Sequence, residues 1–117
     1  MAYFLIQAAY TPESWAAQIR SQENAEDRVR PVIEGLGGRL GVLYYAFGEY
    51  DVVAIGEFPT NDAAAAFSLA VTAGGALKTV KTTPLMTISE GIAAMKKAGD
   101  VTGKYKPPVT KSVAAVN

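Results

Sequence analysis

The sequence of 117 residues contains no histidine and no cysteine. Without histidine, the chain forms neither a Ser-His-Asp triad nor a Cys-His pair, and it lacks the imidazole ligand of most zinc and iron sites. Without cysteine, it forms no disulfide and no reactive thiolate, which is typical of cytosolic proteins. Any catalysis therefore requires tyrosine, carboxylate, lysine or arginine side chains with shifted pKa values, or a bound cofactor. We expect no metal site and no cofactor.

The sequence also lacks an excess of charge and a long apolar run. Eleven basic residues balance eleven acidic ones, so no charged surface points to nucleic acid or an anionic membrane as partner. No apolar stretch reaches about 18 residues, and no basic–apolar leader begins the chain, so we expect neither a membrane span nor a signal peptide. Half of the residues are hydrophobic and 19% are charged, which predicts a folded, cytoplasmic protein of one domain.

Two apolar segments, residues 40–47 and 52–58, are rich in β-branched and aromatic residues and predict two strands joined by a tight turn. In this turn Gly48 can take a positive φ, and Asp51 can hydrogen-bond its own backbone. Both strands are apolar on both faces, so each face needs a cover. Helices of this chain can cover one face, and the second face has no obvious cover within so short a chain.

Helix and strand signals surround this hairpin. They predict a strand over residues 3–10, helices that begin after Thr11 and Asn24, a helix over 63–73, a strand over 76–87 and a short helix over 91–98. Alternation in the first strand places Phe4, Ile6, Ala8 and Tyr10 on one face. Pro31 kinks the second helix or lies close to its start, and Pro84 marks the edge or the end of the last strand. We divide the chain into a domain of residues 1–98 and an extended or disordered tail of residues 99–117.

This order of elements, β-α-β-β-α-β with an extra C-terminal helix, is that of the ferredoxin-like split βαβ arrangement, an α+β fold with a four-stranded antiparallel sheet. Four strands about 4.8 Å apart and about six residues long present roughly 400 Å² on one face, as much apolar surface as monomers normally expose. Joining two such faces buries about 800 Å², worth at most about 20 kcal/mol, against an association cost of roughly 4–15 kcal/mol. We therefore expect a homodimer, or a higher homo-oligomer, joined through its sheets.

The segment Gly48-Glu49-Tyr50-Asp51-Val52-Val53 resembles the GYD-domain family of small bacterial and archaeal proteins. Five further segments are similar to members of that family: Asn24-x-Glu26-Asp27-Arg28, Leu36-Gly37-Gly38, Tyr44-x-x-Phe47-Gly48, Ala73-Gly74-Gly75-Ala76 and Lys81-Thr82-Thr83-Pro84-Leu85. The resemblance covers about residues 3–98 and implies a dimeric α/β barrel, but no assigned reaction. Related barrels include cofactor-free monooxygenases, lactone isomerases, haem-dependent enzymes and ligand-sensing domains, and these analogies rest on fold alone.

Polar side chains in or beside the apolar strands are the candidate ligand-binding residues: Gln7, Tyr50, Asp51, Glu57 and Lys81. In one interpretation, Tyr50 is a donor and Asp51 is a base or an orienting acceptor at the mouth of a cavity. In the other, which we favour, both belong to a turn in which Asp51 binds backbone amides and Tyr50 packs over the hairpin. If Glu57 and Lys81 share the face of Gln7, they line the space between sheet and partner. There a carboxylate and an ammonium must pair or contact a ligand, unless they are rim residues or a salt bridge between protomers.

Three weaker patterns remain open. Lys78, Lys81, Thr82 and Thr83 are an incomplete anion site, because they lack a glycine-rich loop followed by a helix. Tyr3, Trp15, Tyr44 and Tyr45 form either an aromatic pocket for a flat ligand or, more often at such spacing, core and interface packing. Arg28 and Arg39 either bind a carboxylate or are solvated.

Our leading hypothesis is a homo-oligomeric protein that binds a small apolar or aromatic molecule in a mostly apolar cavity, between helices and sheet or between two sheets. One alternative is a cofactor-independent monooxygenase or isomerase, in which a tyrosine and a carboxylate activate an acidic C–H or O–H of an aromatic or lactone substrate. Another is a ligand-free assembly module. Because the chain has no histidine, we favour the binding protein and the assembly module over the enzyme.

Overall fold

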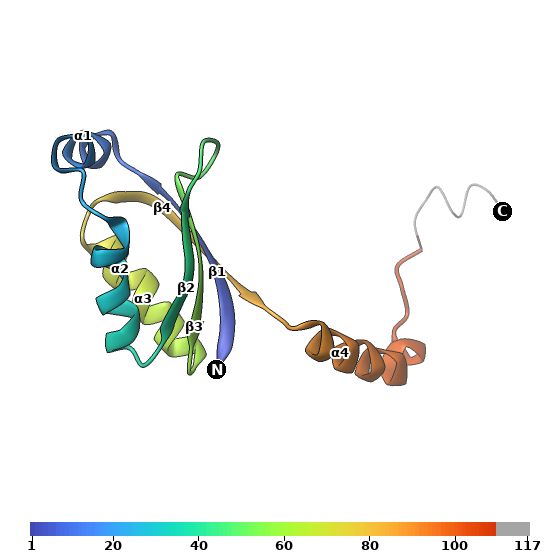
Figure 1. Ribbon diagram of the computed structural model, residues 1–117. Helices are drawn as coiled ribbons and strands as arrows, with labels where there is room; N and C mark the ends of the chain where they lie inside the picture. Colours follow the sequence, from blue (N-terminus) through green and yellow to red (C-terminus); the bar gives the residue numbers. More distant parts are fainter. Residues whose placement is uncertain (110–117) are drawn as a thin grey trace. The chain divides into compact units, whose positions relative to one another are not determined.

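The computed structural model describes residues 1–109 of the chain. Along the sequence the elements are β1 (Ala2–Tyr10), α1 (Pro12–Ser21), α2 (Ala25–Gly35), β2 (Arg39–Tyr45), β3 (Val52–Phe58), α3 (Asn61–Ala73), β4 (Leu77–Leu85), α4 (Ile88–Val101) and a 3-10 turn at Thr102–Lys104 (Figure 1). Met1–Leu85 form one compact unit and the residues from Met86 onward form another.

The strands of the first unit form one four-stranded antiparallel sheet in the order β2-β3-β1-β4. This confirms the predicted α+β class and the four-stranded antiparallel sheet. Strands β1 and β3 are central, and β2 and β4 are the edges. Pro84 lies in edge strand β4 opposite Phe4, where its missing N–H removes no bond to a further strand.

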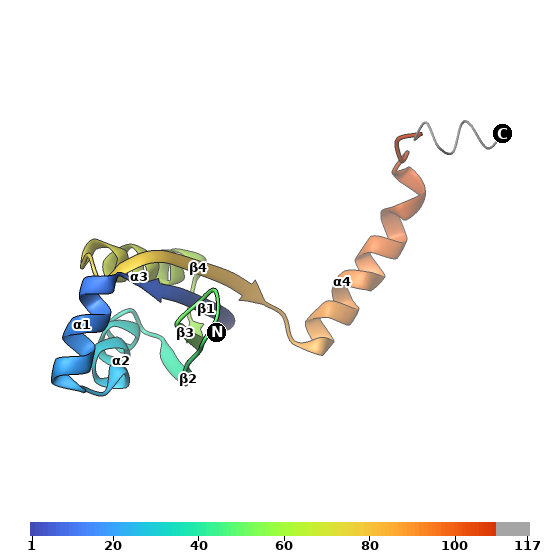
Figure 2. The ribbon, with the colours of Figure 1, turned by 90° about the horizontal axis from the view of Figure 1, so that it is seen from above.

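Helices α2 and α3 lie on the same face of this sheet (Figures 1 and 2). Every second residue of the central strands is buried beneath them, including Phe4 and Phe58. Ile33 of α2 and Phe67 of α3 pack into the same cluster. The Phe58 ring stands 5.7 Å from both the Phe4 and the Phe67 ring, measured between centroids. The strand alternation read from the sequence therefore identifies the core face correctly.

The intervening residues of each strand occupy the opposite face, which neither α2 nor α3 covers; we call it the open face. The register arranges it in three cross-strand rows: Tyr44, Val53, Gln7 and Lys81; Val42, Ile55, Leu5 and Thr83; and Arg39, Glu57, Tyr3 and Leu85. Gln7, Glu57 and Lys81 therefore share one face. The side chains of Tyr3 and Val42 are each 41% exposed there.

Side-chain caps begin α1 and α2 at the predicted residues. Thr11 Oγ1 accepts from Ser14 N at 3.1 Å, and Asn24 Oδ1 accepts from Glu26 N at 2.9 Å. Pro31 lies inside α2 rather than near its start, and the helix continues through it to Gly35. Gly37, with φ at +80°, then reverses the chain into β2.

The turn of the hairpin differs from the prediction. Strand β2 ends at Tyr45, before Phe47, and the φ of Gly48 is not positive. Ala46 N donates to Asp51 O at 2.8 Å, so the four residues enclosed by this bond are 47–50 instead of the predicted 48–51. A loop of this length reverses the chain with ordinary backbone angles, and a left-handed glycine is not needed. Phe47 lies in this loop, fully exposed.

The second unit contains α4, which begins with a reciprocal capping box that the sequence reading missed. Thr87 Oγ1 accepts from Glu90 N at 3.1 Å, and Glu90 Oε1 accepts from Thr87 N at 2.9 Å. The helix continues to Val101, so residues 99–101 are helical rather than extended, because an isolated glycine such as Gly99 weakens a helix without ending it. Residues 110–117 of the expected tail lie outside the described residues. Within residues 1–109, no helix combines the length and apolar character needed to cross a membrane.

Candidate functional site

An apolar pocket of about 320 Å³ lies between the core face of the sheet and helices α2 and α3. Its walls include Ile6, Leu43, Ala54, Val32, Phe67 and Val71. This is one of the two places where the sequence predicted a cavity. We call it the helix–sheet pocket.

Small side chains explain why space remains there. Ala63 and Ala64, in the first half of α3, are buried and let the helix approach the sheet closely. Further along, Ala70 and Gly74 line the helix–sheet pocket, opposite Ala8 of the sheet. The same alanine-rich composition that draws one end of α3 onto the sheet therefore leaves the other end with too little volume to fill the gap.

Tyr10 and Arg28 are the polar side chains that line this otherwise apolar space, among the described residues. Tyr10 is only 8% exposed, and its ring stands edge-on to the Trp15 ring with centroids 5.1 Å apart. Burial raises the pKa of the Tyr10 phenol, and the nearby Arg28 side chain opposes that rise. Tyr10 is therefore protonated at neutral pH and offers an O–H donor.

Gln18 of α1 connects Arg28 to β2. Its Oε1 accepts from Arg28 Nη2 at 2.8 Å and from Tyr45 Oη at 3.3 Å. The Tyr45 ring lies 6.0 Å from that of Trp15. Tyr10, Gln18, Arg28 and Tyr45, which we call the mouth cluster, thus join β1, α1, α2 and β2 at one end of the helix–sheet pocket.

Asp51 holds Tyr10 of this cluster, and the neighbouring Trp15, through hydrogen bonds. Its Oδ2 accepts from Tyr10 N at 2.9 Å and from Trp15 Nε1 at 3.3 Å, and its own N–H donates to Ala8 O at 2.9 Å. Its charge also contributes to the raised pKa of Tyr10. The carboxylate binds a backbone amide, as the turn interpretation expects, but the amide belongs to β1 instead of the hairpin itself. Asp51 therefore fixes the end of β1 and the indole of α1.

The other candidates from the sequence lie elsewhere. Gln7 and Lys81 are neighbours on adjacent strands of the open face. Glu57 shares that face, where its Oε2 is 3.7 Å from Arg39 Nε, so its charge has a partner within the chain. Tyr50 is half-buried in the loop between β2 and β3. The structure thus brings Gln7 and Lys81 together and keeps them apart from the residues that line the helix–sheet pocket.

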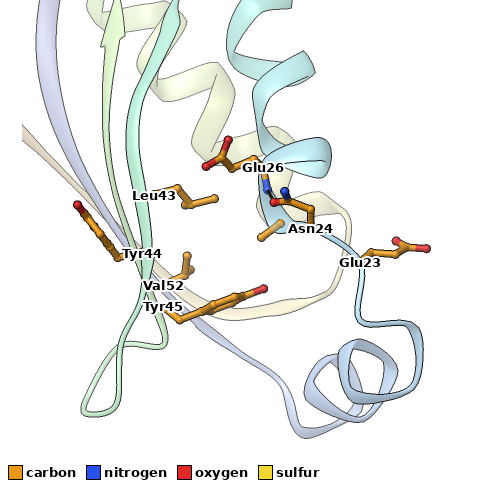
Figure 3. A pocket seen from close by; sticks show the side chains of 8 residues that line it. Glu23, Asn24, Glu26, Leu43, Tyr44, Tyr45 and Val52 are labelled. Carbon is orange, nitrogen blue, oxygen red and sulfur yellow. Dashed lines mark hydrogen bonds between the residues drawn. The ribbon is translucent and has the colours of Figure 1, made fainter.

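A second hollow of about 280 Å³ adjoins the helix–sheet pocket and shares Leu43 and Val52 with it. Figure 3 shows Leu43, Val52 and Tyr45 directed toward the start of α2, whereas Tyr44 points away. Glu23 and Glu26 line its other side. The Glu26 carboxylate is paired with Arg30 at 2.8 Å, and Figure 3 shows the Glu23 carboxylate pointing away from the hollow, so these two side chains do not mark a cation site. Within the described residues, no group of three or more carboxylates gathers closely enough to hold a metal ion.

The sequence reading did not select Tyr10 or Gln18, and it named Arg28 and Tyr45 only in passing. Of the predicted aromatic group, Trp15 and Tyr45 do meet, but Tyr10 joins them in place of Tyr3 and Tyr44. One signal for Tyr10 was available. A tyrosine on the core face of a strand needs a polar partner for its hydroxyl, which indicates that water, a polar side chain or a ligand lies nearby.

No curated protein matches the chain. The family model described as GYD domain matches residues 4–95, which is most of the chain. The match covers all four strands except the first two residues of β1, and it includes α2, α3 and the mouth cluster, together with Gly48, Tyr50 and Asp51. The chain therefore belongs to the GYD-domain family.

Proposed function

We propose that this protein binds a small, mostly apolar molecule in the helix–sheet pocket. The observation that carries the proposal is an apolar concavity with its polar groups gathered at one end. Ligand pockets have volumes of about 300–1,000 Å³ and apolar walls with a few convergent polar groups. At about 320 Å³ the helix–sheet pocket lies at the small end of that range.

The binding unit in this proposal is a homodimer of ferredoxin-like protomers, arranged as a dimeric α/β barrel and joined through the open faces. The apolar middle of that face supports the arrangement: Leu5, Val53 and Ile55 lie on its central strands, beside Gln7 and beside Glu57, which is paired with Arg39. Lys81 and Arg39 lie on its two edge strands, where their charges remain in contact with water. The pattern of an apolar centre and a charged rim is typical of protein interfaces.

Binding without catalysis is favoured over a cofactor-independent monooxygenase or isomerase by the chemistry of the pocket lining. Such an enzyme needs a base beside its substrate. The raised pKa of Tyr10 keeps its phenol protonated at neutral pH, and Arg28 is a permanent cation, so both groups donate hydrogen bonds. The pocket itself also favours a binding protein over a ligand-free assembly module.

Filling the pocket tests the proposal. Ala70 lines the pocket from an exposed position on α3, so Ala70→Leu adds volume there without disturbing the buried part of the helix. Titration with the neutral fluorescent probe N-phenyl-1-naphthylamine should show saturable binding to the wild type and at least tenfold weaker binding to Ala70→Leu. The control is Ala73→Leu, on the same helix and also exposed. Equal binding by all three proteins would contradict the proposed site.

A further inference from the structure

We infer that the ligand of the helix–sheet pocket is an amphipathic monocarboxylate, with its apolar body between α2, α3 and the sheet and its carboxylate on Arg28 and Tyr10. This inference rests on the proposed function, because it names the class of molecule that the same pocket holds. It follows from the size of the pocket, from the pairing of its cation and from the protonation of its phenol.

The volume limits the size of the molecule. A space of about 320 Å³ lies at the small end of the range for ligand pockets, so we expect a ligand of roughly ten to fifteen non-hydrogen atoms. The surrounding side chains are Val, Leu, Ile, Ala and Phe, which offer the body of that ligand no hydrogen bonds. A phenylalkanoate or a medium-chain fatty acid has this size and character.

Among the described residues, Arg28 differs from Arg30 and Arg39 because it has no carboxylate partner. Arg30 Nη2 is 2.8 Å from Glu26 Oε2, and Arg39 is paired with Glu57. Among the described residues, no carboxylate lies within 4 Å of the Arg28 guanidinium, which donates to the neutral amide of Gln18 instead. A guanidinium has five N–H donors in a planar fork that matches a carboxylate, so most of its donors remain for a ligand.

Two carboxylates nearby set the charge of the ligand. Asp51 adds to the raised pKa of Tyr10, and its Oδ2 already accepts from two N–H groups. Glu23 lines an adjoining hollow of about 210 Å³ together with Arg28. Both acids oppose an anion at this place, so only the direct contact with the Arg28 guanidinium favours a carboxylate, and a dianion such as a phosphate monoester is disfavoured further. The protonated Tyr10 hydroxyl supplies a second, neutral donor to the same carboxylate.

Matched acids and amides test the inference. The full-length protein is titrated by isothermal calorimetry with 3-phenylpropanoate and octanoate, and with 3-phenylpropanamide and octanamide, which have the same size and no charge. Because Arg28 is exposed and water screens its charge, each acid should bind about twofold to fivefold more tightly than its amide. Acid and amide of equal affinity would overturn the inference.

Three variants locate the preference for the acid. Arg28→Met keeps the length of the side chain and should abolish the difference between acid and amide while the amide still binds. Arg28→Lys should keep part of the difference, since an ammonium retains the charge but not the fork. Arg20→Met, in the last turn of α1, is the control and should behave as the wild type. An undiminished preference for the acid in a folded Arg28→Met protein would also overturn the inference.

The failure of this inference can be told apart from that of the proposed function. If the amides bind as tightly as the acids and Ala70→Leu abolishes the binding of both, the pocket binds small molecules and the preference for carboxylate is wrong. If no acid and no amide binds to the wild type, both the preference and the proposed binding site are wrong.

Discussion

Asp51 is predicted to stabilise the fold by holding the end of β1 and the indole of α1. In Asp51→Ala, the N–H of Tyr10 and the Nε1–H of Trp15 lose the acceptor that now lies 2.9 and 3.3 Å away. A hydrogen bond contributes about 1 kcal/mol net, and the longer indole bond less, because water can replace it at a partly buried position. We therefore expect a loss of about 1–2 kcal/mol in the free energy of unfolding. This corresponds to a urea midpoint lower by about 1 M.

Trp15 is the chain's one tryptophan, so its fluorescence reports directly on this contact during urea unfolding. Before the transition, the emission of Asp51→Ala should already be shifted to longer wavelength, because water replaces the carboxylate beside the indole. The control is Glu49→Ala, which alters an exposed acid of the same loop and should change the free energy by less than about 0.5 kcal/mol. The same midpoint for both variants would refute the role of Asp51.

Three further changes test other parts of the structure. Gly38→Ala should destabilise the protein by about 1–3 kcal/mol in urea unfolding, because the new methyl group would collide with the carbonyl oxygen of Glu57, and an equal loss in Gly35→Ala, where nothing lies within 4 Å, would refute this reason. Val53→Glu, at the centre of the open face, should give a monomer or an unfolded chain in light scattering, and a folded dimer would count against the proposed interface. Burial raises the pKa of Tyr10 in the folded state above its unfolded value of 10.0, so the free energy of unfolding of the wild type should fall as pH rises beyond about 10. The free energy of unfolding of Tyr10→Phe should fall less over the same pH range, and parallel curves for the two proteins would exclude the burial effect.

The parts of the fold that follow from local chemistry were predictable. Alternation in residues 3–10 identifies the core face, and the oxygens of Thr11 and Asn24 mark the starts of α1 and α2, because each depends on residues close in sequence. The hairpin turn was placed one residue too late, because the hydrogen bond from Ala46 N to Asp51 O encloses residues 47–50, and no single residue in the sequence reveals that bond. The capping box at Thr87 was readable from the sequence and was overlooked.

The helix–sheet pocket could not be read in the same way. Its mouth cluster joins Tyr10, Gln18, Arg28 and Tyr45 from four separate elements, and no spacing in the chain reveals that they meet. Selecting polar residues within apolar strands identified Gln7, Glu57 and Lys81, which share the open face. That criterion finds an unusual face of a sheet. It does not find a space that alanine and glycine leave between a helix and the sheet.

Native mass spectrometry of the purified protein shows at once whether the homo-oligomer forms and whether the helix–sheet pocket is occupied. We expect a homo-oligomer in which each protomer carries a discrete additional mass, either as purified or after incubation with 3-phenylpropanoate. Ala70→Leu should form the same oligomer without that mass. An oligomer that takes up no mass under either condition would contradict binding in the helix–sheet pocket. Equal uptake by wild type and Ala70→Leu would place the bound molecule elsewhere.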